Sequence, residues 1–248
     1  MLLGAGVPAI GQASPPPALS SPCKAPASEI AAPEPLPNVS ALLAEGKPLR
    51  ILAIGSAAIS DQRVPGEGRY QLKLISILQK ALGGTKVEII NRGVSGEVAA
   101  SAAERMQLLA AMTRPNLVLW QVGTNDALAR VDPADFEETV RGAVRWLREH
   151  QIDVVLVGLQ YSSHLARDPA YIAIREAVAR VSKEEHVLHI RRFNAMQLIA
   201  KAQQAEVQGG EQADVLADSN SCMAEHIATA VIANLYLRKK PPPSRPHE

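Results

Sequence analysis

The feature that most constrains the fold is a short apolar run, residues 51–54, which stops at Gly55 and is followed by small side chains. Four apolar residues are too few for a helix and are typical of a central parallel strand that is buried on both faces. Gly55 gives the backbone the freedom to turn sharply after that strand. In open α/β sheets, ligands bind outside the carboxyl ends of the strands, so we expect functional groups just beyond Gly55.

Short apolar runs alternate with segments of helical periodicity along most of the chain. This alternation predicts a parallel sheet covered by helices on both faces, a three-layer α/β/α sandwich with about five strands. After the first strand, we expect strands at 86–90, 117–121, 153–159 and 187–190, helices at 71–82, 97–112, 132–149, 169–183, 195–206 and 222–237, and a polar loop at 208–221.

The two ends of the chain differ in composition from its middle. Residues 1–13 resemble the apolar core and cleavage site of an export signal without its basic start, or are simply an apolar tail. Recurring prolines make 14–46 an extended arm with no packed element. The domain is expected to span 47–238, before a disordered basic and proline-rich tail at 239–248. Export would place the protein in the periplasm or outside the cell.

The chain has two cysteines, Cys23 and Cys222, which are far apart in the sequence. No Cys-x-x-Cys spacing is present, which argues against a zinc or redox motif. In an oxidising compartment the two could form a disulfide between the arm and the last helix. The alternative is two unrelated buried thiols.

The composition excludes several classes of function. The net charge of +1 gives no electrostatic footprint for nucleic acid, and 3% aromatic residues argue against platforms on which bases stack. No apolar run approaches the roughly 18 residues that would span a bilayer. We therefore expect neither a nucleic-acid partner nor a membrane span.

Three polar or glycine-rich segments, 55–57, 91–97 and 121–126, each follow a predicted strand. In a parallel sheet they would converge on one edge. There the N–H of Gly96 at a helix start, the side-chain amide of Asn125 and the N–H of residue 57 would form an oxyanion hole for a developing acyl oxyanion. The alternative is a helix-entry glycine at 96 and a capping turn at 125–126.

These segments resemble the SGNH hydrolases, also called GDSL esterases. The resemblance covers about 47–238 and is most specific in the run Leu-Val-Leu-Trp-Gln-Val-Gly-Thr-Asn-Asp-Ala at 117–127, with Asn-Arg-Gly-Val-Ser-Gly-Glu at 91–97 and Gly-Ser-Ala at 55–57. Residues 159–161 and 191–193 resemble an exported bacterial branch of the family. The resemblance implies a flavodoxin-like sandwich and ester hydrolysis by a serine, with a histidine base in an Asp-x-x-His segment before the last helix. It implies no metal and no organic cofactor.

The chain departs from the family pattern at the position of the nucleophile. That position, two residues after the glycine, holds Ala57, whose methyl group cannot attack a carbonyl. Ser56 lies one residue too early, so its hydroxyl should miss the acyl carbon, and displacements of that order cost orders of magnitude in rate. The alternative role of Ser56 is a turn or cap hydroxyl.

The second departure is the absence of histidine from the segment before the last helix. One alignment places the base near Asp214 and its acidic partner near Glu211. A rival register uses Asp218, with Ser221 where the histidine belongs. Neither register offers an imidazole that could take a proton near neutral pH.

Histidines elsewhere in the chain are poor substitutes for that base. His226 could serve only if the last helix were shifted. His164 follows the fourth strand and either overhangs the crevice or is an exposed loop residue, and His186 and His189 are expected to be structural or solvated.

Two functional hypotheses follow from these residues, beside a third alternative in which the protein is purely structural and its proline-rich arm and basic tail make contacts in the envelope. The first is an exported hydrolase of carboxylic or acetyl esters from envelope carbohydrate or lipid, with an atypical, impaired site. The second is an inactive pseudo-hydrolase that binds an acyl or acetylated ligand, or a protein partner.

Overall fold

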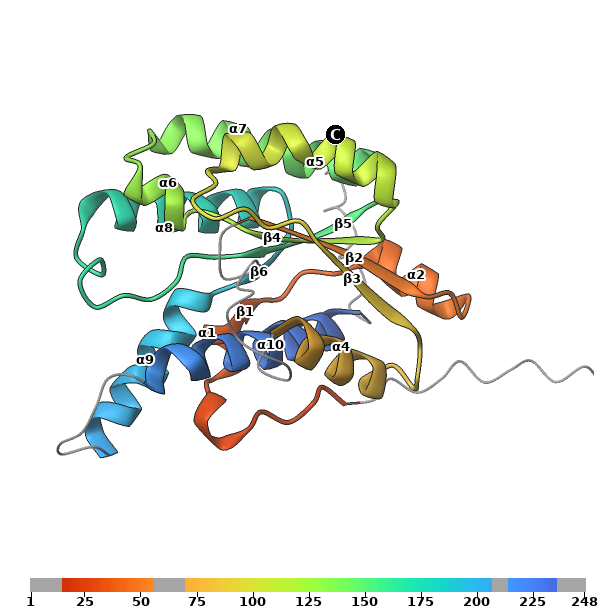
Figure 1. Cartoon of the computed structure of the whole chain (residues 1–248), viewed down its shortest axis with the longest axis horizontal. Helices are drawn as coiled ribbons and strands as arrows, with labels where there is room; N and C mark the ends of the chain where they lie inside the picture. Colours follow the sequence, from red (N-terminus) through yellow and green to blue (C-terminus); the bar gives the residue numbers. More distant parts are fainter. Residues whose placement is uncertain (1–14, 56–69, 207–213, 236–248) are drawn as a thin grey trace, which may run out of the picture.

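The computed structural model of the protein describes residues 15–55, 70–206 and 214–235, without the side chains of 205–206 and 214–220. A six-stranded sheet lies at its centre (Figure 1). The strand order is β1-β6-β5-β4-β2-β3. All neighbouring strands are parallel except β1, which runs antiparallel to β6. The bounds are β1 Ala31–Ala32, β2 Leu49–Gly55, β3 Val87–Asn91, β4 Leu117–Gln121, β5 Asp153–Val157 and β6 Leu188–Ile190.

The five parallel strands have the order of a flavodoxin-like, doubly wound sheet, which confirms the predicted fold class. Their winding direction reverses between β2 and β4, where Gly55 and Gln121 are paired at the strand ends. In such sheets the ligand crevice lies outside the strand ends at this switch point. The sixth strand, β1, was not predicted and lies at the far edge from β3.

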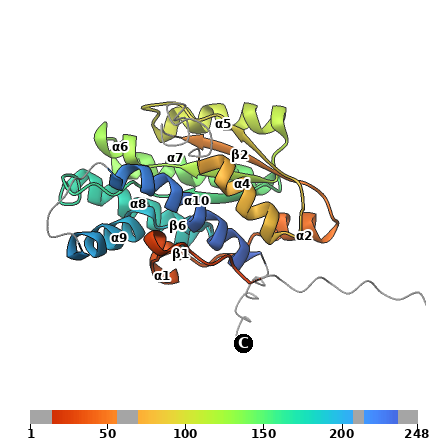
Figure 2. The ribbon, with the colours of Figure 1, turned by 60° about the horizontal axis from the view of Figure 1, so that its bottom comes forward.

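Helices cover both faces of the sheet because strand side chains alternate between two apolar clusters. Trp120 packs among α5, α7 and α8 on one face, whereas Leu119 packs toward α4 and α10 on the other. Figure 2 shows α4 and α10 lying side by side.

None of the described helices is long and apolar enough to cross a membrane. The bounds are α4 Tyr70–Ala81, α5 Ala99–Thr113, α6 Thr124–Leu128, α7 Pro133–Glu149, α8 Pro169–Glu184, α9 Arg192–Glu206 and α10 Asp214–Asn234.

The arm that precedes β2 is folded onto the domain, so the prediction that it carries no packed element is wrong. It forms η1 Ser21–Cys23, α1 Ala27–Ile30, β1 and α2 Pro37–Ala44. Proline limits the backbone but is well suited to the first turn of a helix, as Pro37 is in α2. The apolar side chains between the prolines are buried against the domain, namely Cys23, Ile30, Leu36 and Val39.

A disulfide between Cys23 and Cys222 joins the arm to α10, so of the two alternatives for the cysteines the structure contains the bridge. Hydrogen bonds extend this junction on both sides. The Ser20 hydroxyl donates to Glu225 Oε1 at 2.7 Å, and His226 Nε2 lies 2.8 Å from the Cys23 carbonyl oxygen. The arm and the last helix therefore form one packed unit.

The last helix begins at Asp214, eight residues before the predicted start at 222, so the predicted loop at 208–221 is wrong from 214 onward. Aspartate, serine and asparagine are weak helix formers, which favoured a loop. Tertiary packing overrides that preference, because α10 lies along α4. Lys73 Nζ of α4 donates to the Ser221 hydroxyl at 2.5 Å and to Glu225 Oε1 at 2.7 Å.

We predict that the disulfide contributes strongly to stability, because it closes a loop across a sequence separation of 199 residues. Loop-closure entropy gives about 5 kcal/mol for a loop of this length. Urea denaturation of the oxidised protein and of the double variant Cys23→Ser/Cys222→Ser measures the difference. Two titratable thiols in the unfolded, unreduced protein would contradict the bridge.

Candidate functional site

The carboxyl ends of β2 and β4 approach each other so closely that only glycine fits at position 55. A Cβ built on Gly55 would lie 2.0 Å from the Gln121 carbonyl oxygen, and Gly55 has φ +114°, a value that side chains disfavour. The Gly55 carbonyl also accepts a hydrogen bond from the Val94 N–H at 2.8 Å. Gly55 therefore connects the ends of β2 and β4 to the loop that follows β3.

Gly96 lies in a tight turn within that loop. The Glu97 N–H donates to the Val94 carbonyl at 3.3 Å, and Gly96 has φ +77°, as the third residue of a type II turn requires. Because α5 begins only at Ala99, the prediction that Gly96 lies at a helix start is wrong. The Gly96 N–H makes no hydrogen bond to any part of the chain that the structure describes.

Asn125 lies in the short helix α6, which follows β4, and its side chain reaches the same turn. Its Nδ2 donates to the Glu97 carbonyl oxygen at 2.8 Å, so the structure brings Gly96 and Asn125 together. A side-chain amide carries two N–H groups. The second N–H of Asn125 and the N–H of Gly96 are thus two donors available at one edge of the sheet.

Asp126 is a positioning residue, and it makes the capping turn that was the alternative interpretation of residues 125–126. Its side chain is buried, and it accepts the Ala99 N–H at 2.8 Å and the Gly123 N–H at 3.2 Å. It therefore caps the start of α5 while holding the turn that carries Asn125. Burial raises the pKa of the Asp126 carboxyl group, although its hydrogen bonds with backbone N–H groups act to lower it.

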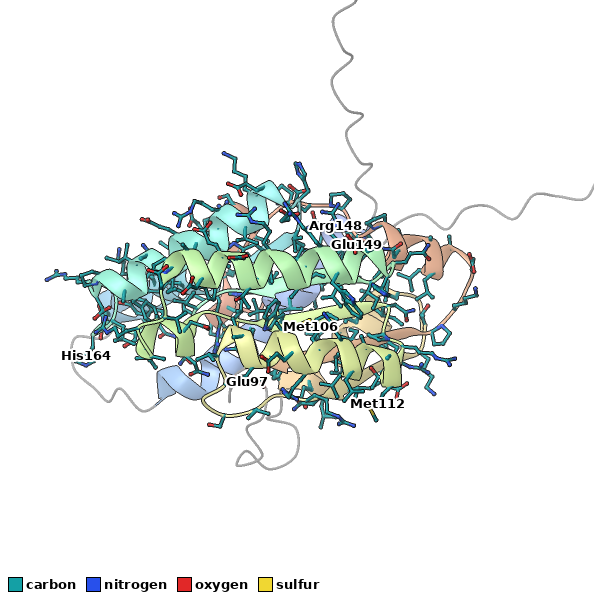
Figure 3. All side chains as sticks on the ribbon, turned by 90° about the horizontal axis from the view of Figure 1, so that it is seen from above. Glu97, Met106, Met112, Arg148, Glu149 and His164 are labelled. Carbon is teal, nitrogen blue, oxygen red and sulfur yellow. A yellow bond between two sulfur atoms is a disulfide. The ribbon has the colours of Figure 1, made fainter. Side chains whose placement is uncertain are left out.

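Glu97 anchors the other side of the turn. Its two carboxylate oxygens accept from Arg105 Nε at 2.7 Å and Nη2 at 2.8 Å, and only 4% of the Glu97 side chain is exposed. Arg105 also donates to the Arg92 carbonyl oxygen at 2.9 Å. Figure 3 shows Glu97 at the end of the loop that enters α5. In the sequence, the opposite charges of Glu97 and Arg105 were the signal for this ion pair. The pairing could be inferred from them only with the knowledge that the loop folds back onto α5.

The positions of the expected nucleophile and base are only partly within the structure. Ser56 and Ala57 lie outside the described residues, as does Glu211. Asp214 and Asp218 belong to the first two turns of α10 rather than to a loop, and the structure describes their backbone alone.

The described histidines lie away from this edge. His226 is buried against the Cys23 carbonyl, and His189 faces a separate cavity beside α8. His164 is exposed, and Figure 3 shows it at the rim of the molecule, well away from Glu97. In the part of the chain that the structure describes, no group of three or more His, Cys, Asp or Glu side chains could hold a metal ion.

We predict that Asp126→Asn destabilises the protein by about 1–3 kcal/mol, because the amide nitrogen would face a buried N–H in place of an acceptor. Asp132→Asn is the control, since Asp132 is the exposed N-cap of α7 and asparagine caps helices equally well. Equal free energies of unfolding for the two variants, measured in urea, would refute the assigned role of Asp126.

We also predict that stability falls as the pH drops from about 6.5 toward 4. Burial lowers the pKa of His189 from 6.5 to about 4, and burial also lowers the pKa of His226. The unfolded chain therefore takes up protons in this window that the folded protein does not, which costs about 3 kcal/mol at most for His189. His189→Gln should flatten the pH dependence of the unfolding free energy, and His164→Gln is the matched change at an exposed site.

Comparison with known proteins agrees with the fold and identifies the family. A model of the non-GDSL lipase-like family matches residues 22–236, which includes most of the folded arm. Esterase TesA of Pseudomonas aeruginosa is 30% identical over 109 residues, which are 43% of this chain and 52% of that esterase. The match thus spans about half of the curated relative.

Solved esterases share the fold at low sequence identity. A variant of Axe2, an acetyl xylan esterase from Geobacillus stearothermophilus, superimposes with a TM-score of 0.60 at 16% identity, covering 77% of this chain and 97% of its own. A two-domain esterase active on acetylated mannans gives 0.68 at 13% identity, covering 90% of this chain and 60% of its own. The chain therefore belongs to the non-GDSL lipase-like family of SGNH hydrolases.

Proposed function

We propose that this protein binds an acyl or acetyl ester of envelope carbohydrate or lipid at the edge formed by Gly55, Gly96 and Asn125, and that its hydrolytic step is impaired. The observation that carries the proposal is the hydrogen bond from Asn125 Nδ2 to the Glu97 carbonyl, which holds the amide beside Gly96. Two N–H donors held at the same turn suit a polarised carbonyl oxygen.

The nucleophile is the first missing element. Position 57 carries a methyl group, so no covalent acyl intermediate can form there. Ser56 is the adjacent residue, and its hydroxyl would have to reach an acyl carbon that the family geometry places against the following residue. Misplacement of that kind costs orders of magnitude in rate.

The base is the second missing element. The segment 207–221 has no histidine, and the carboxylates at Asp214 and Asp218 are too weakly basic to take a hydroxyl proton efficiently near neutral pH. Donors without nucleophile and base still give some acceleration in serine proteases, but it is small beside that of the intact set. Binding with little or no turnover is the expected behaviour.

Two relatives guide the choice of ester. One neighbour in fold is an acetyl xylan esterase and another is active on acetylated mannans, which makes acetylated carbohydrate the first ligand to test. The Cys23–Cys222 disulfide supports a location in the periplasm or outside the cell, because such bonds persist in oxidising compartments.

We predict that the parent protein hydrolyses p-nitrophenyl acetate no faster than its Ser56→Ala variant, while it binds acetylated xylo-oligosaccharide saturably. Asn125→Ala should weaken that binding by about 5- to 10-fold, which is the loss of one hydrogen bond. Calorimetry measures the binding, and deacetylated oligosaccharide is the control ligand.

Adding the missing nucleophile and base tests whether their absence is what impairs hydrolysis. The double variant Ala57→Ser/Asp214→His should raise kcat by about 100-fold or more over Ala57→Ser alone, because it supplies a general base. If the parent hydrolyses the ester and Ser56→Ala does not, Ser56 is the nucleophile, and the proposal that the hydrolytic step is impaired is wrong.

A further inference from the structure

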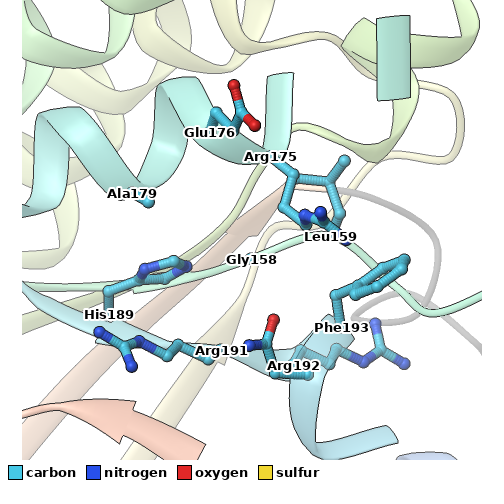
Figure 4. A pocket seen from close by; sticks show the side chains of 10 residues that line it. Gly158, Leu159, Arg175, Glu176, Ala179, His189, Arg191, Arg192 and Phe193 are labelled. Atoms are coloured by element: carbon cyan, nitrogen blue, oxygen red, sulfur yellow. The ribbon is translucent and has the colours of Figure 1, made fainter. Parts of the chain in front are cut away.

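A second cavity, of about 210 Å³, lies between α8 and the beginning of α9, and it shares no residue with the Gly55–Gly96–Asn125 edge. Its walls come from the residues after β5, from α8, from β6 and from the residues after β6 (Figure 4). Its lining includes Gly158, Arg175, Glu176, His189, Phe193 and Asn194.

The imidazole of His189 is the central polar group of this cavity. His189 is only 6% exposed, and Figure 4 shows its ring pointing into the cavity. The ring makes no hydrogen bond to any group in the described parts of the chain. Burial keeps it neutral, with a pKa of about 4, so that one ring nitrogen donates and the other accepts. A buried polar group without a protein partner is costly unless water or a ligand satisfies it.

Gly158 provides the space that this ring occupies. A Cβ at residue 158 would lie 2.7 Å from His189 Nε2, so alanine would push the imidazole out of its place. The backbone here is otherwise regular, since the Gly158 N–H donates to the Ile190 carbonyl at 3.0 Å. The glycine is thus required by the histidine rather than by a turn.

Arg175 supplies positive charge at the same cavity. Its guanidinium carbon lies 4.3 Å from the centre of the Phe193 ring, a cation–π contact that leaves the N–H groups of the guanidinium unused. No carboxylate among the described residues forms an ion pair with it. Arg191 and Arg192 also line the cavity, so the positive charges at its walls outnumber the negative charge of Glu176. The local potential is therefore positive and favours an anion.

We propose that this cavity is a binding site for a small hydroxy-carboxylate. The carboxylate accepts from the Arg175 guanidinium, which suits its planar, bidentate geometry, and from the N–H of neutral His189. The hydroxyl group of the ligand bonds to Asn194 or Glu176 at the wall. The volume is below the range of pockets for drug-sized ligands, which limits the ligand to a few carbon atoms.

The test is a titration of the full protein with D-glycerate, followed by calorimetry and by the NMR signals of the His189 ring. Glycerol is the neutral control of the same skeleton, and inorganic phosphate is the control for anions in general. We expect saturable binding of glycerate, with shifts at His189, and binding at least about 10-fold weaker for both controls. Equal binding of glycerol, tighter binding of phosphate, or no binding of glycerate would each overturn the proposal.

Matched variants locate the binding. Arg175→Gln should weaken glycerate binding at least about 10-fold, whereas Arg180→Gln, the same change on α8 at a residue paired with Glu137, should not. Gly158→Ala should abolish it, whereas Gly142→Ala in α7, where a Cβ meets nothing within 4 Å, should leave it unchanged. Unchanged binding in Arg175→Gln would refute the site, and if Gly158→Ala fails to fold, the Arg175→Gln and Arg180→Gln pair decides.

One variant separates this proposal from the proposed ester site. Asn125→Ala should bind glycerate like the parent, because Asn125 lies on α6 and lines no part of this cavity. A loss of glycerate binding in Asn125→Ala would show that the ligand occupies the ester site, and it would overturn the assignment to α8 and β6.

Discussion

The close approach of Gly55 to the Gln121 carbonyl is the contact on which the carboxyl edge of the sheet depends. Any larger residue would force β2 and β4 apart at the point where the winding of the sheet reverses. Because Gly55 also accepts the Val94 N–H, such a displacement would carry the loop after β3 with it. The Gly96 turn and the Asn125 amide meet only because β2 and β4 end together.

Polar contacts hold the loops at this edge, together with the buried apolar side chains of Val122 and Ala127. Asp126 connects the start of α5 to the turn after β4, and the ion pair of Glu97 with Arg105 fastens the loop after β3. Exposed loops have little apolar surface to bury, so their geometry depends on hydrogen bonds between fixed partners. These contacts fix the Gly96 turn and the Asn125 amide at this edge of the sheet.

The regular elements were predictable because their signals are local. The strand 117–121 has the predicted bounds, because Pro115 marks a break and a short, mostly apolar run follows it. The starts of α7 and α8 follow from Asp-Pro pairs, in which the aspartate caps the helix and the proline occupies its first turn. The glycine at the end of β2 was likewise predictable, because a sharp turn there depends on backbone freedom, whereas the oxyanion roles of Gly96 and Asn125 stay predictions.

What escaped prediction depends on contacts between distant parts of the chain. Cys23 allowed a bridge to the last helix as one of two alternatives, but nothing within residues 20–32 indicates that Ile30 is buried where the arm pairs with β6. The early start of α10 reflects packing on α4, and the pairing of Asp126 with the Ala99 N–H needs two loops to meet. Likewise, His189 becomes a candidate for ligand binding only once Gly158 is seen to make room for its ring.

The bridge between the arm and α10 has a consequence for the order of events during synthesis. Cys222 follows Cys23 by 199 residues, so the bridge can form only after the segments of β2 to β6 have been synthesised. With two cysteines in the chain, no competing intramolecular pair can form in the meantime. Once formed, the bond encloses strands β2 to β6 in one covalent loop whose two ends are the arm and α10.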